Sequence, residues 1–596
     1  MKQRLADYVA DFLVSHGIRD VFSVVGGGAM HLNDALGHHK ALNSIYCHHE
    51  QACAMAAEAY ARVDNRVALV CVTTGPGATN AITGVAGAWM DSIPMLVISG
   101  QARLATTVYA SGLNLRTRGI QEFDITGSVA NMTKYCTLVS APDQIRYCLE
   151  KALYLAKEGR PGPCWLDIPL DVQAAMIEPD QLIGYEPLSP QGRIDDETVQ
   201  SIVEKLMHAR RPLIFAGNGI RLSGAHSAFV QLVEKMRIPV VTGMGSIDAI
   251  ETDSPYFIGR NGTTGDRPGN FAIQRCDVLL SLGSRLSLQQ TGFNYDLWAK
   301  QAYKILNDID PLELEKDSLH ADMKVCCDVG DLIHQLDRTI SQVPLPDYSV
   351  WLKKCTEWKA AYPVVQSHHY QSREISIYAF YHEMTTMLSA NRSIVVSVGT
   401  SRVAGSQASI IKKGQRFYTN PSIAAMGWGL PAAIGVCIAE GRKPLVLVTG
   451  DGSLQMNLQE LQTIAHHHFP ITVFVMNNQG YHSIRMTQNN YFGEPLVGVG
   501  PESQDLSFPD LSKLIPAYGL KYVRIEKMAD LHKQLAEILN GDAPCVCEVM
   551  LSTAQQTEPK VASRQLPDGQ MASAALEDMA PFLPRDELRK ALEVDE

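Results

Sequence analysis

Short runs of apolar, β-branched residues recur along the chain and alternate with longer stretches of helical periodicity. The apolar runs are residues 67–72, 95–99, 213–216, 278–282, 394–398, 445–449 and 471–476. Continuous apolar strands of this length, separated by helices, are typical of parallel sheets covered on both faces. The pattern therefore predicts an α/β fold of doubly wound parallel sheets.

Two stretches interrupt this pattern and predict domain boundaries. Residues 179–192 contain three prolines and no helical period, and residues 343–348 (VPLPDY) precede a helical segment. The predicted domains are residues 1–178, 190–342 and 365–552, each of ordinary domain size. Residues 553–596 are polar and irregular. We expect them to form a lid, a wrapping arm or a mobile end.

Composition narrows the class of protein. Of the 596 residues, 46% are apolar and 19% are charged, which excludes a disordered or collagen-like chain. The net charge of −11 argues against a nucleic-acid or membrane-surface role, and no segment of 18 apolar residues exists. Residues 1–17 predict an amphipathic helix rather than a signal peptide. The 13 cysteines form no CxxC pair, which favours reduced thiols in a cytoplasmic protein.

The strongest chemical signal lies in residues 445–478. A strand ends at Thr449, a glycine turn holds Asp451, a helix opens at Ser453, and a second strand ends before Asn478. Parallel strands joined in this way end at the same sheet edge, where α/β proteins bind ligands. We therefore expect Asp451 and Asn478 to lie together at that edge.

The groups at this edge suit a metal-bound phosphate. Carboxylate and amide oxygens are hard ligands for Mg²⁺, which completes its shell with phosphate oxygens and water. Gly452 lets the backbone approach a phosphate, and the helix N-terminus at Ser453 favours negative charge. The alternative is an ordinary tight turn with an aspartate cap. The GDG turn followed at this spacing by Asn477-Asn478 makes that alternative the weaker one.

This segment resembles the diphosphate-binding motif of thiamine-diphosphate (ThDP) enzymes. Other ordered matches cover most of the chain and are most similar to the acetolactate synthase group. They are residues 23–28 (SVVGGG), 49–51 (HEQ), 74–80 (TGPGATN), 90–94 (MDSIP), 159–163 (GRPGP), 425–435 (AMGWGLPAAIG) and 451–461 (DGSLQMNLQEL). The resemblance implies a pyrimidine-binding first domain, a Rossmann-like central domain and a diphosphate-binding third domain.

The resemblance also implies catalytic residues. Glu50 would hydrogen-bond the aminopyrimidine ring of ThDP and so promote removal of the proton from the thiazolium carbon. Gly27 would lie in a loop beside the reacting carbon, His31 could carry protons, and Gln121 would line the substrate channel. Without the other motifs, Glu50 would be a glutamate at a helix N-terminus, and a lone histidine such as His31 is more often structural.

Further residues are assigned to cofactor and metal by the same resemblance. Met426 would separate the two cofactor rings, the Ala424 carbonyl would accept from the 4′-amino group, and the Gly480 carbonyl would be a third Mg²⁺ ligand. The cofactor-binding set is Thr400, Ser401, Ala424, Met426, Gly452, Ser453, Gly480 and Tyr481, and the metal ligands are Asp451, Asn478 and Gly480.

Some positions depart from the acetolactate synthase pattern. Thr487 stands where a pocket tryptophan is expected, and Gln289 stands in place of an arginine that binds the substrate carboxylate. Arg116 and Arg118 could hold an acidic substrate or could equally be solvated. These departures point to a different acceptor. Glycine turns in the central domain leave open whether it holds FAD, another nucleotide or no ligand.

The sequence therefore predicts a ThDP- and Mg²⁺-dependent enzyme that decarboxylates a 2-oxo acid and adds the activated aldehyde to an acceptor carbonyl. Simple decarboxylation, C–C bond hydrolysis, a flavin-linked oxidase and a non-catalytic ThDP-fold protein are the alternatives. Because the resembled family builds its site from two subunits, we expect a homodimer or homotetramer.

Overall fold

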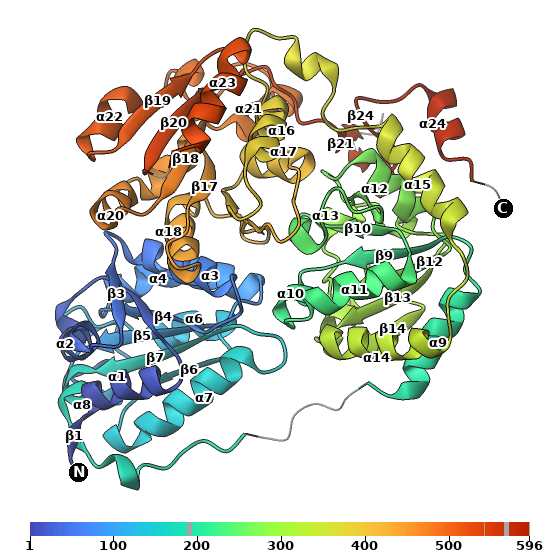
Figure 1. Ribbon diagram of the computed structural model, residues 1–596. Helices are drawn as coiled ribbons and strands as arrows, with labels where there is room; N and C mark the ends of the chain where they lie inside the picture. Colours follow the sequence, from blue (N-terminus) through green and yellow to red (C-terminus); the bar gives the residue numbers. More distant parts are fainter. Residues whose placement is uncertain (188–193, 542, 566–570, 595–596) are drawn as a thin grey trace.

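Three parallel sheets organise the chain. The computed structural model describes residues 1–187, 194–541, 543–565 and 571–594, and Figure 1 shows them as three α/β lobes. Each lobe contains a six-stranded sheet in which all paired strands run parallel. The predicted class, doubly wound parallel sheets, is confirmed.

The N-terminal sheet has the strand order β3–β2–β4–β5–β7–β6. Its strands are β2 (Asp20–Ser23), β3 (Asn43–Tyr46), β4 (Ala68–Val72), β5 (Met95–Gln101), β6 (Tyr135–Leu138) and β7 (Pro163–Pro169). The helices of this lobe are α1 (Leu5–Ser15), α2 (Met30–His38), α3 (Glu50–Ala61), α4 (Pro76–Met90), α5 (Val108–Ser111), α6 (Ile125–Val129), α7 (Ile145–Lys157) and α8 (Leu170–Ala174). A short antiparallel pair joins β1 (Gln3–Arg4) to β8 (Met176–Ile177).

The central sheet has the order β11–β10–β9–β12–β13–β14. Its strands are β9 (Pro212–Ala216), β10 (Val240–Thr242), β11 (Phe257–Arg260), β12 (Val278–Leu282), β13 (Tyr303–Asp308) and β14 (Met323–Cys326). Its helices are α9 (Asp196–Met207), α10 (Gly219–Leu222), α11 (His226–Met236), α12 (Arg267–Arg275), α13 (Leu288–Thr291), α14 (Val329–Gln342) and α15 (Ser349–Ala361). Of the expected first linker, residues 188–193 lie outside the described part of the chain.

The C-terminal sheet has the order β16–β15–β17–β18–β20–β19. Its strands are β15 (Ile394–Val396), β16 (Phe417–Tyr418), β17 (Leu445–Gly450), β18 (Ile471–Asn477), β19 (Lys521–Ile525) and β20 (Cys545–Met550). Its helices are α16 (Ile377–Met387), α17 (Thr400–Ala408), α18 (Gly429–Ala439), α19 (Asp451–Leu454), α20 (Glu460–His467), α21 (His482–Tyr491), α22 (Leu511–Ala517) and α23 (Met528–Leu539).

Burial on both faces explains why the strands read as continuous apolar runs. In β4, Leu69 and Cys71 enter one core of the N-terminal lobe, whereas Val70 and Val72 enter the other. Side chains alternate between the faces of a strand, so apolar cores on both faces favour apolar residues at successive positions.

The last segment of the chain packs along the central lobe. It contains β21 (Lys560–Val561), β22 (Ser563–Gln565), β23 (Met571–Ser573), β24 (Met579–Ala580) and α24 (Arg585–Ala591). Leu576 and Leu588 join a core that includes Phe271. Trp358 Nε1 donates to the carbonyl of Ala591 at 2.8 Å. The described tail therefore contributes to the central core.

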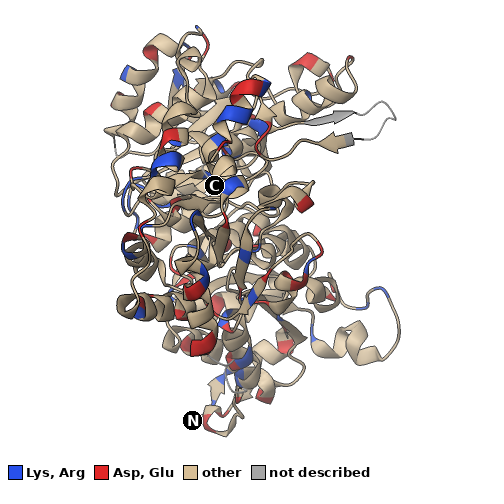
Figure 2. Cartoon of the chain, turned by 90° about the vertical axis from the view of Figure 1, so that its right-hand side faces the viewer, with Lys and Arg blue, Asp and Glu red and all other residues tan. Residues whose placement is uncertain are grey.

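Charged residues are spread over the whole chain. Figure 2 shows basic and acidic residues interspersed rather than gathered in one basic stripe. Among the described residues, no helix combines the length and apolarity that a membrane crossing requires.

Close helix packing joins the N-terminal and C-terminal lobes. Helices α3 and α18 contribute to one shared core, and α3 is rich in buried alanine. A Cβ atom at Gly435 of α18 would lie 2.0 Å from the carbonyl oxygen of Ala56. The absence of a side chain at this glycine therefore permits the contact between the two helices.

We predict that Gly435→Ala lowers the thermal unfolding midpoint. Overpacking typically costs about 1–3 kcal/mol, whereas Gly→Ala inside a helix otherwise gains up to about 1 kcal/mol. Gly37→Ala in α2 is the control, because its Cβ would meet only the hydroxyl end of the Tyr46 side chain. Differential scanning fluorimetry compares the two, and a higher midpoint for Gly435→Ala would contradict the packing argument.

Candidate active site

One half of the candidate site lies at the carboxyl edge of the C-terminal sheet. Strands β17 and β18 pair in parallel, with Gly450 opposite Met476. Asp451 directly follows β17, and Asn478 directly follows β18. The predicted strand–helix–strand unit is confirmed, and it brings both residues to the same edge. We call this the diphosphate half-site.

The Asp451 carboxyl is buried at this edge. The residue is 4% exposed, and its oxygens accept from the backbone N–H groups of Gly480 (2.8 Å) and Gly452 (2.9 Å). Burial raises the pKa of Asp451 to about 7, although the two N–H groups partly offset this effect. A bound cation would favour the carboxylate, so the site suits a hard divalent ion.

The two adjacent asparagines have different environments. Asn477 donates to Glu548 at 2.6 Å and accepts from the Gln479 backbone at 2.9 Å, so its amide holds the turn. Asn478 is 5% exposed, and its side chain forms no hydrogen bond within the described part of the chain. A buried amide without a partner fits a ligand position, which agrees with the assignment of Asn478 rather than Asn477 to the metal.

The proposed third metal ligand is partly engaged. The Gly480 carbonyl accepts from His482 N at 3.0 Å, which leaves one lone pair for an ion. Gly480 has a φ of 119°, and a Cβ there would lie 2.0 Å from the Val499 carbonyl oxygen. Glycine is therefore required at this position by both backbone conformation and space.

Two further glycines lie beside this edge. Gly399, with a φ of 69°, precedes α17, which begins at Thr400 and contains the buried Ser401. The ring of Tyr481 packs against Gly452, where a Cβ would lie 2.4 Å from the ring. Helix N-termini with exposed N–H groups attract anions.

The loop with Ala424 and Met426 borders the same half-site. Ala424 has a φ of 51°, and its N–H donates to Asn420 Oδ1 at 3.1 Å. The hydroxyl of Ser453 accepts from the next loop glycine, Gly427, at 3.0 Å, which joins the loop to α19. Met426 is 39% exposed and offers an apolar, adaptable surface to a ligand.

One predicted element of this half-site is different in the structure. The helix expected from Ser453 is divided into α19, a 3₁₀ turn (Gln455–Asn457) and α20. Asn457 donates to the Gly427 carbonyl at 3.0 Å and to Gln51 Oε1 at 3.1 Å. These tertiary contacts coincide with the tighter turn, and local periodicity does not reveal them.

The second half of the site lies in the N-terminal lobe around Glu50, the first residue of α3. His49 supplies the cap, because its Nδ1 accepts from Gln51 N at 3.0 Å. The Glu50 carboxylate instead accepts from Asn80 Nδ2 of α4 at 3.0 Å. A Cβ at Gly77 would lie 3.4 Å from Glu50 Oε1. Glu50 is therefore not the hydrogen-bonding cap of its helix, and we call this region the pyrimidine half-site.

Two loops contact the segment that lies beside Glu50. In the first, Gly28 N donates to Thr73 Oγ1 at 3.1 Å, and Gly27 beside it is exposed. In the second, Gln121 is exposed with a φ of 56°, and its carbonyl oxygen lies 3.2 Å from Thr74 Oγ1. Residues 73–77 thus lie between Glu50 and both loops.

The remaining predicted residues lie on several elements of the three lobes. His31 is half-buried on α2, directly after the glycine loop. Arg116 and Arg118 are both exposed, and Arg118 donates to the Ala105 carbonyl at 3.1 Å. Thr487 on α21 and Gln289 on α13 are exposed as well.

Hydrogen bonds between the N-terminal and C-terminal lobes lie next to the two half-sites. Besides the Asn457–Gln51 contact, His48 N donates to Glu460 Oε1 at 3.0 Å. Within the described residues, no hydrogen bond connects Glu50 with Asp451 or Asn478.

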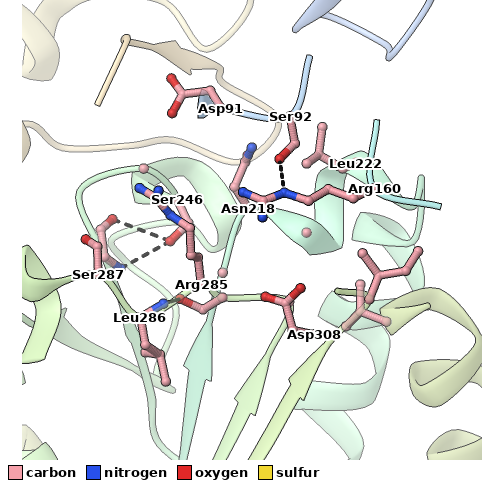
Figure 3. Close-up of a pocket in the computed structure, with 18 of the residues that line it drawn as sticks. Asp91, Ser92, Arg160, Asn218, Leu222, Ser246, Arg285, Leu286, Ser287 and Asp308 are labelled. Carbon is pink, nitrogen blue, oxygen red and sulfur yellow. Dashed lines mark hydrogen bonds between the residues drawn. The ribbon is translucent and has the colours of Figure 1, made fainter. Parts of the chain in front are cut away.

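A separate cavity of about 660 Å³ lies where the three lobes meet (Figure 3). Its lining includes Ser92 and Arg160 of the N-terminal lobe, Asn218 and Asp308 of the central lobe, and Ser422 of the C-terminal lobe. Burial raises the pKa of Asp308. The volume and the mixture of polar and charged groups suit a small organic ligand of nucleotide size.

A cluster of His368, His369 and Glu558 has the composition of a metal site. His369 Nδ1 accepts from the Gln366 backbone at 3.0 Å, and its Nε2 lies 3.0 Å from Glu558 Oε1. Accepting at Nδ1 leaves the proton of the neutral ring on Nε2, where it donates to the carboxylate. His369 and Glu558 therefore join the tail to the segment before α16, and both ring nitrogens of His369 are in use.

The structure also reveals site residues that the sequence analysis did not assign. Asn80 orients Glu50, Thr73 and Thr74 support both flanking loops, and Asn420 holds Ala424. Asn80 and Thr74 fall inside the recognised segment 74–80, which was a usable signal. Nothing in the local sequence distinguishes Asn420.

Comparison with known proteins agrees with this arrangement. Three family models match the chain: the N-terminal TPP binding domain of thiamine pyrophosphate enzymes (residues 3–127), their central domain (199–336) and their C-terminal TPP binding domain (397–549). Together these ranges cover more than half of the chain.

Similar curated proteins extend over nearly the whole length. Acetolactate synthase isozyme 2 large subunit of Escherichia coli (strain K12) is 30% identical, over 96% of this chain and 100% of its own. Acetolactate synthase large subunit of Cyanidium caldarium is 29% identical, over 93% and 94%. A probable acetolactate synthase large subunit of Methanocaldococcus jannaschii is 28% identical, over 92% of each chain. The chain therefore belongs to the thiamine pyrophosphate enzyme family, in its acetolactate synthase-like group.

Proposed function

We propose that the protein uses ThDP and Mg²⁺ to decarboxylate a 2-oxo acid and to join the resulting activated aldehyde to an acceptor carbonyl. The observation that carries this proposal is the buried pair of Asp451 and Asn478 at one sheet edge. When bound, ThDP supplies a nucleophilic carbon and accepts the electron pair that CO₂ leaves behind.

The residues of the diphosphate half-site would hold the cofactor. Asp451, Asn478 and the Gly480 carbonyl supply oxygen ligands for Mg²⁺, and the N-termini at Thr400 and Gly452 favour the diphosphate. The Ala424 carbonyl would accept from the pyrimidine amino group, and the exposed Met426 side chain would support the cofactor rings.

The pyrimidine half-site would supply the acid–base group. Glu50 would hydrogen-bond the pyrimidine ring and hold a proton there, with its carboxylate oriented by Asn80. Gly27, His31 and Gln121 would surround the reacting 2-oxo acid.

Because no hydrogen bond among the described residues joins Glu50 to Asp451 or Asn478, we propose that two copies complete the half-sites reciprocally. A two-fold axis would place Glu50 of each subunit against the diphosphate half-site of the other, giving a homodimer or a tetramer of such dimers. Exposed apolar side chains near each half-site support this arrangement: Ile120 is 89% exposed in the N-terminal lobe, and Phe492 is 81% exposed in the C-terminal lobe.

The acceptor is proposed to differ from that of acetolactate synthase. Thr487 and Gln289 are smaller or uncharged compared with the tryptophan and arginine of that group, so a bulkier or less acidic acceptor would fit. The proposed reaction transfers no net electrons and therefore requires no flavin redox step. The interdomain cavity could hold FAD or another nucleotide. We place the reaction in the cytoplasm, and the 13 free cysteines agree with this.

We predict that the purified protein, given ThDP, Mg²⁺ and pyruvate with a panel of aldehydes and oxo compounds, releases CO₂ and forms a product two carbons longer than the acceptor. Mass spectrometry identifies the product. CO₂ release without an acceptor adduct would instead indicate a simple decarboxylase.

We predict that Glu50→Gln abolishes turnover and leaves ThDP binding within about threefold of wild type. The amide cannot hold the transferred proton, but it keeps the shape of the side chain. The matched control is Glu357→Gln on α15, where the side chain is exposed. Steady-state kinetics and calorimetry measure both effects, and full activity of Glu50→Gln would sink the proposed mechanism.

We predict that Asp451→Ala weakens Mg²⁺-dependent ThDP binding by more than about 100-fold, because loss of even an outer-shell partner costs about 10–100-fold. Isothermal titration calorimetry with and without Mg²⁺ measures this change. Asp530→Ala, at an exposed position of α23, should bind as wild type does. Unchanged affinity in Asp451→Ala would rule out this metal site.

A further inference from the structure

A buried polar chain leads from the middle of the N-terminal sheet toward Gln121. Asp167 of β7 is 2% exposed. Its Oδ1 accepts from Ser99 Oγ at 2.6 Å, and its Oδ2 accepts from Gln101 Nε2 at 2.8 Å. The Ser99 hydroxyl also accepts from Trp165 Nε1 at 2.8 Å. No cation forms an ion pair with Asp167 in the described chain.

The Gln101 amide connects Asp167 to the loop that contains Gln121. Its Nε2 also donates to the Phe123 carbonyl at 2.9 Å, while its Oε1 accepts from Thr74 Oγ1 at 2.6 Å and from Ala102 N at 2.9 Å. All hydrogen-bonding positions of the amide are thus in use. A reversed amide would set its oxygen against the Asp167 carboxylate and the Phe123 carbonyl, so these two acceptors together fix its orientation.

The backbone of Gln121 depends on these neighbours. Its φ of 56° lies in the left-handed region, which is unfavourable for residues other than glycine and persists where the surroundings impose it. Thr74 Oγ1 lies 3.2 Å from the Gln121 carbonyl oxygen. A Cβ at Gly75 would lie 2.3 Å from the same oxygen. The carbonyl therefore packs directly against residues 74–75.

The burial of the Asp167 carboxyl in these surroundings lowers the free energy of unfolding. Burial raises the pKa of Asp167 to about 7, offset in part by Ser99 and Gln101, and the charge of Asp124 raises it further. The groups that face Asp167 are neutral Ser99 and Gln101 from β5, apolar Leu138 opposite it on β6, and Asp124 at the start of α6. An unpaired carboxyl is expensive in such a place, and its presence suggests a functional role.

We propose that Asp167 is a positioning residue for the substrate loop, residues 119–124. Its carboxylate orients the Gln101 amide, which holds the Phe123 carbonyl directly and keeps the Thr74 hydroxyl beside the Gln121 carbonyl. Protonation at Oδ2 would place an O–H against the Gln101 N–H donor and weaken the connection. The inference rests on the proposed function only in that Gln121 lies against the substrate.

Hydrogen–deuterium exchange tests the positioning without any assay of activity. In Asp167→Asn and in Thr74→Val, a peptide covering residues 119–124 should exchange at least about threefold faster than in wild type, because local opening becomes easier. Asp143→Asn, at an exposed position before α7, should leave the exchange unchanged. If Asp167→Asn does not fold, Thr74→Val alone decides. Unchanged exchange in a folded variant would overturn the inference.

Kinetics with the 2-oxo acid test the effect on the substrate. Asp167→Asn should lower kcat/KM about tenfold at pH 8, mainly through KM, because one charge-assisted hydrogen bond is lost. The ratio of wild type to variant should shrink as the pH falls below about 7, where wild-type Asp167 becomes neutral. ThDP affinity should stay unchanged.

A double-mutant cycle links the effect to Gln121. In a Gln121→Ala background, Asp167→Asn should cause little further loss, because both changes act through one loop. A pH-independent ratio together with additive losses would overturn the inference while leaving the proposed function intact. Absence of turnover in wild type, with faster loop exchange in the variants, would instead reject the proposed function and retain the positioning role.

Discussion

The burial of one carboxyl at a sheet edge is the constraint on which the rest of the site depends. Asp451 has little access to water and no ion-pair partner among the described residues, so its charge is costly until a cation arrives. Gly452 and Gly480 stand beside it because a side chain at either position would displace Tyr481 or the Val499 carbonyl. The Asn478 side chain has no hydrogen-bond partner among the described residues at the same edge. This is the position at which we propose that a metal-bound anion is held.

The packing of α18 against α3 supports the loop beside that sheet edge. Helix α18 follows the loop of Ala424 and Met426, and it packs against α3, which begins at Glu50. Small residues on both helices permit this close packing. The packing holds the diphosphate half-site in a fixed position relative to the N-terminal lobe. In the N-terminal lobe, a separate polar chain runs from Asp167 through Gln101 to the substrate loop.

Much of this organisation could be predicted from the sequence. Apolar runs such as residues 278–282 coincide with strands such as β12. A strand buried on both faces favours apolar residues at successive positions, and this run is visible in the local sequence. The parallel pairing of β17 and β18 then required Asp451 and Asn478 to share an edge. The division of the helix after Asp451 could not be predicted, because it accompanies contacts of Asn457 with residues far away in the chain. Similarly, the roles of Asn80, Asn420 and Asp167 arise from partners on other elements, which hydrophobic periodicity does not reveal.

The central claim is that Glu50 of one subunit acts on the cofactor held by Asp451 of its partner. The most direct measurement uses a mixed dimer, in which one subunit carries Glu50→Gln and the other Asp451→Ala, purified through two different affinity tags. Two-fold symmetry would give this dimer one site with both defects and one intact site, and hence about half of wild-type activity. If each site instead lay within a single chain, every site would carry one defect, and the mixed dimer would be inactive.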